Sequence, residues 1–364
     1  MQKIFLQIIV ISTLFGIYSP KTISAEIGLL DEADVVVSSR ARTERQAALK
    51  TALSSVFVKN SGLPSVLEHP LVKAQINKPE VLLTQYGYRE IDDELTLKAN
   101  FDHKRIISTL RQADLPVWGR QRPLTLLWLS IEDEGERSIL SDASELDTRA
   151  QIDLDSSNKG IPVILPVMDL DDVMKISVSD VRGMFTDVVA DASTRYRADY
   201  FAVADMDKVG GFVRFQVSLF DKDSQGGIMQ PLIHHQAEVL DYQEATDQIL
   251  STLAEYFVSQ YAFADSGNSA ETLLSLTGVQ SMAQLVEIES YLNQLSAIKA
   301  VSLSQFKANT VTYKLELFGD ADDLQKLLNI NKRLTEIPQL DTNDELADMK
   351  FAPEQVTTLF YQWH

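Results

Sequence analysis

The sequence contains no cysteine among its 364 residues. This absence excludes disulfide bonds, thiolate nucleophiles and cysteine metal sites, as well as a lipid anchor on a processed N-terminal cysteine. The five histidines show no metal-binding spacing such as H-E-x-x-H. His234 and His235 are adjacent in a predicted strand, where neighbouring side chains point to opposite faces and cannot share one metal. We therefore expect no metal and no cofactor.

Basic residues are few, with 33 Lys and Arg against 52 Asp and Glu and a formal net charge of −19. Nucleic-acid binding relies on Lys and Arg that displace counterions from phosphates, so this balance argues against it. The same balance disfavours adsorption on an anionic membrane surface. Beyond the N-terminal segment no apolar run approaches the roughly 18 residues of a membrane-spanning helix, and none is expected there.

The first 25 residues have the three regions of a cleavable signal peptide. Lys3 supplies the positive start, and the apolar run that follows is about 15 residues long, short of the roughly 20 needed to span a bilayer. Small residues, Ser24 and Ala25, precede Glu26. We therefore expect cleavage between Ala25 and Glu26 and export to the periplasm as a soluble chain, with an uncleaved N-terminal anchor as the alternative. Cleavage would leave 31 basic and 52 acidic residues, a net charge of −21.

The remaining chain exceeds the roughly 250–300 residues that one hydrophobic core can serve, so several domains are expected. The pattern of elements predicts an α+β protein, with two β-α-β-β-α split-sandwich domains on either side of a central domain built on a mixed three-layer sheet. The predicted boundaries are 1–25 for the signal peptide, 26–115, 116–265 and 270–337 for the three domains, and 338–364 for an acidic and aromatic tail. The residues of the tail leave open whether it docks or stays loose.

Hydrophobic periodicity and turn residues predict the elements of each domain. In the N-terminal domain they are a strand at 33–38, a helix at 43–59, a hairpin at 82–101 and a helix at 103–112. In the central domain they are buried strands at 124–131 and 160–167, a helix within 133–155, one helix at 179–196, strands at 200–206, 212–220 and 230–240, and a helix at 241–263. In the C-terminal domain they are strands at 272–279, 298–306, 310–318 and 332–337, and helices at 281–295 and 320–328.

The junction at residues 115–123 (L-P-V-W-G-R-Q-R-P) carries the first candidate site. Two prolines and a glycine interrupt regular structure there. Trp118 lies beside Arg120 and Arg122, and tryptophan and arginine dominate the energetics of protein interfaces. The hypothesis is a binding site for a partner protein. The alternative is that Trp118 packs between domains and the arginines pair with nearby acids.

Asp169, Asp171 and Asp172 form the second candidate site. They follow the predicted strand 160–167, and ligands of open α/β sheets often bind beyond the carboxyl ends of strands. The run lacks the D-x-D-x-D-G pattern of a calcium loop, so helix capping is the alternative to a cation or small-ligand site. The sequence contains no G-x-S-x-G, P-loop or G-x-G-x-x-G motif.

Several segments together resemble the proteobacterial domain-of-unknown-function 2066 family (DUF2066). They are the helix at 42–62, Q-Y-G-Y at 85–88, the junction at 115–123, Trp128-Leu129, and G-I-P through P-V-M-D-L-D-D at 160–172. The resemblance extends over most of the mature chain and implies an exported protein without assigned activity. Residues 179–263 show a looser likeness to envelope-assembly modules of the TolB N-terminal and CsgG type and to flagellar assembly protein T.

These patterns predict a non-enzymatic periplasmic binding or envelope-assembly factor with an envelope protein partner. The alternative is a periplasmic hydrolase or a small-ligand or cation-binding protein that uses Asp169, Asp171 and Asp172. A third possibility is a structural spacer. The oligomeric state stays open.

Overall fold

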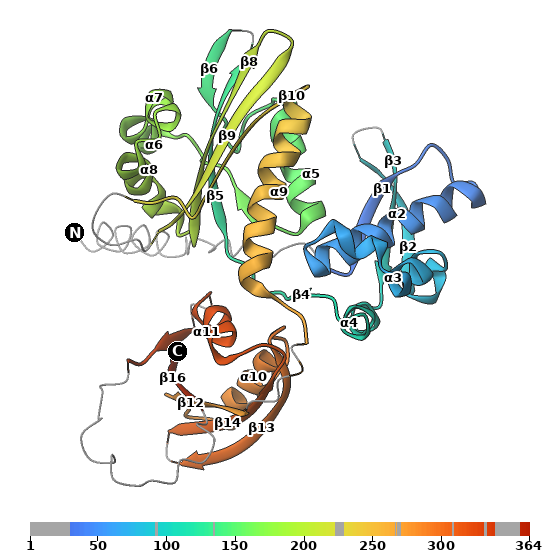
Figure 1. Cartoon of the computed structure of the whole chain (residues 1–364), viewed down its shortest axis with the longest axis vertical. Helices are drawn as coiled ribbons and strands as arrows, with labels where there is room; N and C mark the ends of the chain where they lie inside the picture. The colour runs from blue at the N-terminus through green and yellow to red at the C-terminus, as the bar shows by residue number, and fades with distance from the viewer. Residues whose placement is uncertain are drawn as a thin grey trace, which may run out of the picture.

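The computed structural model describes residues 30–91, 94–133, 135–222, 229–265, 267, 271–307, 309–330, 333–338 and 357–364. Helices and sheets contribute to all three domains, so the predicted α+β class is confirmed (Figure 1). The predicted signal peptide lies outside the described residues. Within them, no helix combines the length and the apolar character that a bilayer crossing requires.

The N-terminal domain packs helices against a three-stranded antiparallel sheet in the order β1-β3-β2. Its elements are β1 (Glu32–Val36), α2 (Arg42–Ser61), α3 (Pro70–Ile76), β2 (Leu83–Ile91), β3 (Glu94–Phe101) and α4 (His103–Gln112). The predicted β-α-β-β-α order is present, with the additional helix α3. Proline starts α3, where its missing N–H would have no helical partner in any case.

The central domain contains a mixed sheet in the order β10-β9-β8-β5-β6, with β7 paired to β5. Its strands are β5 (Thr125–Asp133), β6 (Glu136–Ile139), β7 (Val163–Ile164), β8 (Tyr200–Val209), β9 (Phe212–Asp221) and β10 (Ile233–Val239). β5 runs parallel to β8, and its first seven residues are all buried. This confirms the prediction of a central strand from its continuous apolar run.

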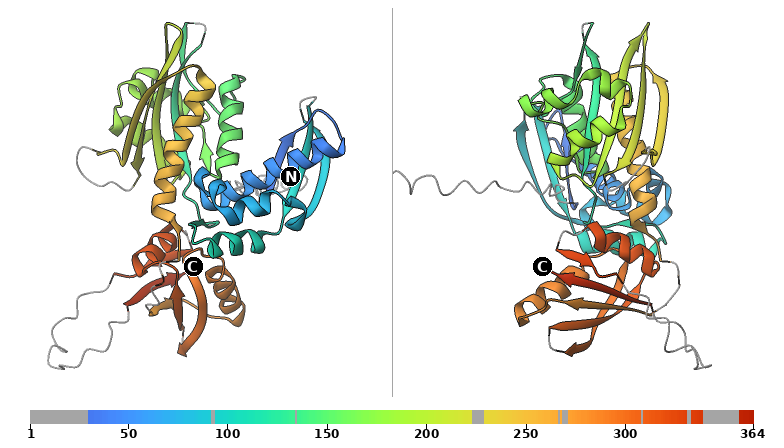
Figure 2. Two further views of the ribbon diagram at one scale, coloured as in Figure 1. Left: turned by 45° about the vertical axis from the view of Figure 1, so that its right-hand side comes forward. Right: turned by 90° about the vertical axis from the view of Figure 1, so that its left-hand side faces the viewer.

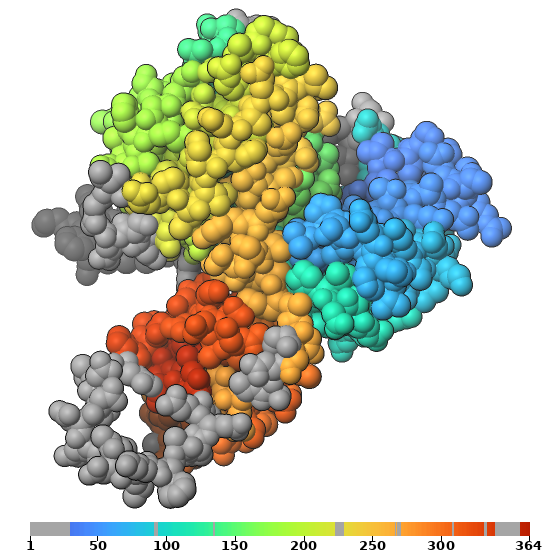
Figure 3. Space-filling model, viewed as in Figure 1, coloured from blue at the N-terminus to red at the C-terminus, as the bar shows by residue number. Residues whose placement is uncertain are grey.

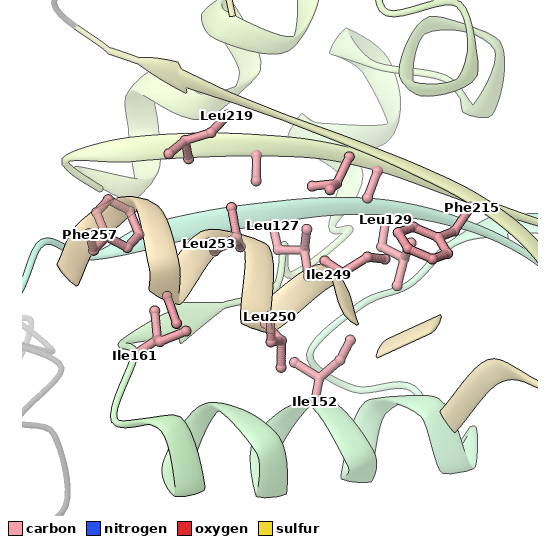
Figure 4. Packing of buried hydrophobic residues seen from close by; sticks show 14 of the residues in the cluster. Leu127, Leu129, Ile152, Ile161, Phe215, Leu219, Ile249, Leu250, Leu253 and Phe257 are labelled. Carbon is pink, nitrogen blue, oxygen red and sulfur yellow. The ribbon is translucent and has the colours of Figure 1, made fainter. Parts of the chain in front are cut away.

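Helices cover both faces of this sheet (Figures 1 and 2). They are α5 (Asp147–Lys159) and α9 (Tyr242–Tyr261) on one face, and α6 (Leu170–Lys175), α7 (Val178–Arg182) and α8 (Thr186–Ser193) on the other. Successive β5 side chains alternate between the two cores, because Leu127 and Leu129 face α9 whereas Leu126 and Trp128 face the α6–α8 layer. Figure 4 shows Leu127 and Leu129 beside the α9 residues that cover them.

Three central predictions need correction. The buried strand expected at 160–167 is reduced to β7, because Pro162 and Pro166 have no N–H to donate to a ladder. The single helix expected at 179–196 is divided into α7 and α8, and Met184 between them has a left-handed φ of 52°. The helix expected within 133–155 is α5, which begins inside that range and continues to Lys159, and the hairpin strand β6 precedes it.

The C-terminal domain has a five-stranded sheet in the order β13-β14-β12-β16-β15. Its elements are β12 (Glu271–Thr277), α10 (Met282–Leu292), β13 (Ile298–Lys307), β14 (Thr310–Leu317), α11 (Ala321–Ile330), β15 (Leu334–Glu336) and β16 (Thr357–Trp363). Ser281 caps α10 as predicted, in a capping box with Gln284. The end of the tail docks as β16, parallel to β12, and buries Tyr361 and Trp363.

The three domains meet at the end of α9 (Figures 1 and 3). There the short strand β4 (Val117–Trp118) pairs with β11 (Ala262–Phe263). Arg111 of α4 donates to the carbonyls of Phe263 and Ser296, and its guanidinium lies 3.7 Å from the ring centroid of Phe318. Burial lowers the pKa of Arg111 to about 10. A residue of the N-terminal domain thus holds both neighbouring domains.

Candidate functional site

Trp118 and Arg122, predicted as a partner site, lie inside the domain junction, where both are buried. The Arg122 guanidinium lies 3.9 Å from the Trp118 ring centroid. Its nitrogens donate to four carbonyls: Gly119 at 2.8 Å, Trp118 at 2.9 Å, Lys59 at 2.6 Å and Gly160 at 2.5 Å. For Trp118 the structure shows the alternative, packing between domains, and the hypothesis of an exposed partner site at Trp118 and Arg122 is wrong. Arg122 connects α2 to the C-terminal end of α5.

Arg122 fits neither interpretation of the sequence, a partner site or an ion pair with nearby acids, because it donates to backbone carbonyls. Burial lowers the pKa of Arg122 to about 9, so the side chain still carries its charge at neutral pH. Gly160 has a φ of 68°, and a Cβ built there would lie 2.2 Å from Arg122 Nη1. Only glycine fits this close approach. Arg120 is exposed, and a partner role for it stays a prediction.

Asp169 of the predicted acidic cluster caps helix α6. Its carboxylate accepts the backbone N–H groups of Asp171 at 3.1 Å and Asp172 at 3.2 Å. Arg195 donates to both of its oxygens, at 2.6 and 2.8 Å. The alternative of helix capping is thus what the structure shows for Asp169. Asp171 is exposed on the same helix.

Asp172 lies on the inner side of α6 and is completely buried. One carboxylate oxygen accepts from Arg195 at 3.0 Å, and the other accepts from the backbone N–H of Met168 at 3.0 Å and from the Tyr196 hydroxyl. The Tyr196 hydroxyl in turn accepts the N–H of Val167 at 2.8 Å. Burial, followed by the hydrogen bond with Asp172, raises the pKa of Tyr196. This network fixes both the helix and the loop before it.

The carboxylates of this network are engaged by hydrogen-bond donors. Arg195 forms ion pairs with both Asp169 and Asp172, and the hydrogen bond with Asp169 raises the pKa of Arg195. Across the described ranges, no three His, Asp or Glu side chains are grouped in a way that could hold a metal ion. The geometry suits a structural anchor for α6.

The outer side of α6 is apolar and uncovered by the described residues. Leu170, Val173 and Met174 are 73%, 60% and 78% exposed. Their spacing places them on one side of the helix, opposite Asp172. Val167, just before the helix, is also exposed, and we call these four residues the α6 face. Figure 3 shows the α6–α8 layer as a flank of the central domain, away from the other two domains.

Sequence reasoning missed the α6 face, although a signal for it was present. The stretch L-D-D-V-M-K at 170–175 places apolar residues at positions i, i+3 and i+4, as in an amphipathic helix. An apolar stripe of this kind normally indicates the core side of a helix. Here the buried side is the one that carries Asp172.

The pair formed by Asp169 and Arg195 should stabilise the protein above about pH 4 and lose this contribution as the pH falls towards 2. The hydrogen bond with Arg195 lowers the pKa of Asp169 to about 2, below the roughly 3.9 of an unfolded aspartate. Between these values the unfolded chain binds more protons, so acid favours unfolding.

Urea unfolding of the wild type and of Asp169→Asn at pH 6 and pH 3 measures this contribution. The substitution should lower stability at pH 6, and the gap should narrow at pH 3. A gap of equal size at both pH values would contradict the assignment. Asp171→Asn, which changes an exposed acid on the same helix, is the control.

Two family matches cover the two ends of the chain. Residues 24–119 match a family described as "Domain of unknown function (DUF8605)", and residues 271–363 match DUF2066. The predicted DUF2066 family is confirmed by the second match, which covers the C-terminal domain rather than most of the chain. The segments that suggested the resemblance lie between residues 42 and 172. Those before residue 119 lie within the residues that match the first family, DUF8605. No curated protein matches the chain.

Similar solved structures cover only parts of this chain. The LpoB C-terminal domain from Salmonella enterica is 13% identical, with 37% of this chain and 93% of that chain covered and a TM-score of 0.22. The PelC dodecamer from Paraburkholderia phytofirmans is 10% identical, with 37% and 86% covered and a TM-score of 0.21. A formyltetrahydrofolate deformylase from Pseudomonas putida is 9% identical, with 55% and 90% covered and a TM-score of 0.15. At these scores the likeness assigns no function.

Proposed function

We propose that this chain is an exported protein that binds another protein of the cell envelope through the α6 face, and that it acts by binding rather than by catalysis. The observation that carries the proposal is the exposure of Leu170, Val173 and Met174 on one side of α6. Contiguous apolar side chains surrounded by polar surface are typical of protein-binding sites. The signal-peptide pattern of residues 1–25 supports export.

The anchor beneath the helix favours binding. A six-residue helix has little stability of its own, but Asp172 and Arg195 hold α6 in place before any partner arrives. A preformed surface loses less conformational entropy on association. Burial of each apolar side chain would contribute roughly 1.5–3 kcal/mol.

A protein is a better partner for this face than a lipid surface. The chain carries a net charge of −19, which anionic lipids repel. Asp171 is exposed on α6 itself, and Asp191 of α8 pairs with Lys175 at the end of α6. We therefore expect the partner to present an apolar surface with basic residues around it.

Photo-crosslinking in intact cells tests the proposal. A crosslinking amino acid in place of Leu170 should capture one envelope protein at a yield that saturates, and Met174→Asp should reduce this yield at least tenfold. The matched control position is Leu154, another exposed leucine, which lies on α5 across the sheet. Equal capture at both positions, or none at Leu170, would refute binding at this face. Export is tested in the same cells, because the protein released by osmotic shock should begin at Glu26.

A further inference from the structure

Strand β13 forms one edge of the C-terminal sheet. It pairs with β14 on one side, and no other described strand lies on its outer side. Alternate N–H and C=O groups of an edge strand point outward, where they can pair with an added strand. β-Bulges interrupt the pairing between Ile298 and Ala300 and between Leu303 and Gln305, so residues 300–303 and 305–307 form two regular stretches.

β13 carries apolar side chains that the described residues leave uncovered. Leu303 lies opposite Tyr313 of β14, and the Tyr313 hydroxyl donates to the carbonyl of Leu285 in α10. Directly paired residues point to the same face of a sheet, so Leu303 faces the α10 side. Phe306 lies opposite the buried Val311 and faces the same way. Leu303 and Phe306 are nevertheless 56% and 51% exposed.

Helix α10 contacts β13, and Figure 1 shows the two elements beside each other. Glu287 pairs with Arg333 near β15, and Tyr291 packs on Trp363 of β16, with ring centroids 6.1 Å apart. These two residues mark the side of α10 that faces away from β13.

The opposite side of α10 carries Met282 and Val286, four residues apart and therefore on one stripe of the helix. Both are largely exposed. The hydrogen bond from the Tyr313 hydroxyl to the Leu285 carbonyl places this part of α10 beside the stretch of the sheet that carries Leu303. Met282, Val286, Leu303 and Phe306 are therefore the exposed apolar side chains of α10 and the edge of β13, and we call them the α10–β13 surface.

Charge limits what can pair with this edge. β13 carries Lys299 and Lys307 and no acid, in a chain with a net charge of −19. The exposed Glu289 belongs to the α10 side, whereas Lys307 follows Phe306 and points to the opposite face of the sheet. Lys299 lies within 3.7 Å of Asp265, whereas Lys307 is exposed at the end of the strand. A second copy paired antiparallel through β13 would bring lysines of both strands together. An acidic strand meets no such repulsion.

We propose that the edge of β13 binds an extended acidic segment of another protein, which adds to the sheet as a sixth strand. Main-chain hydrogen bonds to β13 would supply affinity, and alternate apolar side chains of the added strand would pack on the α10–β13 surface. Lys307 would select an acidic residue of the added strand. This site lies in a different domain from the α6 face and does not depend on the function proposed for it.

A fluorescent octapeptide in which isoleucine alternates with aspartate is the probe, and fluorescence anisotropy with the full mature chain measures its binding. Saturable binding is expected, and the same peptide with lysine in place of aspartate should bind at least about tenfold more weakly. Two peptides, N-methylated on all isoleucines or on all aspartates, test strand addition. Residues alternate between the two edges of a strand, so only one of these peptides should lose binding.

Substitutions test whether the peptide binds at the α10–β13 surface. Val286→Asp should weaken binding at least about tenfold, whereas Ala283→Asp, on the outward side of the same helix, should change it less than about twofold. Lys307→Glu should reverse the preference between the acidic and basic peptides. All three residues are exposed, so the fold should persist. The proposal is overturned if the acidic peptide does not saturate, if both methylated peptides bind alike, or if β13 instead mediates a dimer that Lys307→Glu strengthens.

Discussion

Replacement of Arg122 by methionine should lower the free energy of unfolding by about 3–5 kcal/mol. The four carbonyls that Arg122 bonds belong to three segments, and methionine donates to none of them. A buried carbonyl without a donor costs about 1–3 kcal/mol. Part of the summed cost of the unpaired carbonyls is offset, because the variant no longer buries a charge. Any water that enters and donates to a carbonyl offsets a further part. Methionine keeps most of the contact with the Trp118 ring, so the loss reports mainly on hydrogen bonds.

Urea unfolding at pH 7, followed by tryptophan fluorescence, measures this loss. Arg120→Met is the matched control, because Arg120 lies two residues away and is exposed, and it should change stability by less than about 0.5 kcal/mol. Arg122→Lys should fall between the two, since an ammonium group cannot reproduce the planar fork that reaches four carbonyls. If Arg122→Met stayed within about 1 kcal/mol of the wild type, the carbonyls would have found other donors.

The same substitution should change how the domains unfold. Arg122 joins α2 of the N-terminal domain to α5 of the central domain through the carbonyls of Lys59 and Gly160. Without it, the N-terminal domain should lose part of its coupling to the rest of the chain, and the urea transition should broaden or divide.

Local patterns in the sequence predicted much of the fold. The continuous apolar run of β5 indicated a strand buried on both faces, and the alternation in β3 indicated a strand with one buried face. Ser281 identified the start of α10 by its capping chemistry. Each of these signals acts within a few residues, so one sequence is enough to read it.

Long-range pairing was harder to predict. β16 inserts between β12 and β15, and its partner in β12 lies more than 80 residues earlier in the chain. The alternation of Leu359, Tyr361 and Trp363 could have indicated a strand, but nothing local shows where a strand pairs. At 160–167 the prediction was too long rather than missing. The apolar content of this segment suggested a full strand, but Pro162 and Pro166 restrict it to two residues.

The candidate sites show the same division. Composition drew attention to Trp118 and Arg122, and packing between domains was one of the two interpretations of Trp118. The sequence could not reveal that Arg122 is buried against backbone carbonyls. In the acidic cluster, helical spacing does separate the roles of the aspartates. Asp172 lies on the side of α6 opposite Leu170 and Met174, which marks it as the buried member once the other side is known to be exposed.

Asp172→Ala should destabilise the protein by about 2–4 kcal/mol, because it removes a buried carboxylate that accepts two hydrogen bonds besides its pair with the partly exposed Arg195. Arg195 would keep Asp169, which is partly exposed, but the Tyr196 hydroxyl and the Met168 N–H would lose their acceptor. Asp171→Ala, one residue away and exposed, is the matched control and should cost less than about 0.5 kcal/mol. Urea unfolding of the three proteins at pH 7 gives the comparison.

Hydrogen exchange, measured amide by amide, distinguishes a loss of anchoring at α6 from a loss of stability of the whole protein. Hydrogen exchange of the α6 amides should quicken in Asp172→Ala more than exchange in α9, because a six-residue helix without its anchor opens on its own. Crosslinking from Leu170 should fall in the same variant while the chain remains folded. If α6 kept its protection and the crosslink persisted, Asp172 would contribute to stability without shaping the α6 face. The docking surface would then depend on the cap supplied by Asp169 and on the packing of α6 against α8.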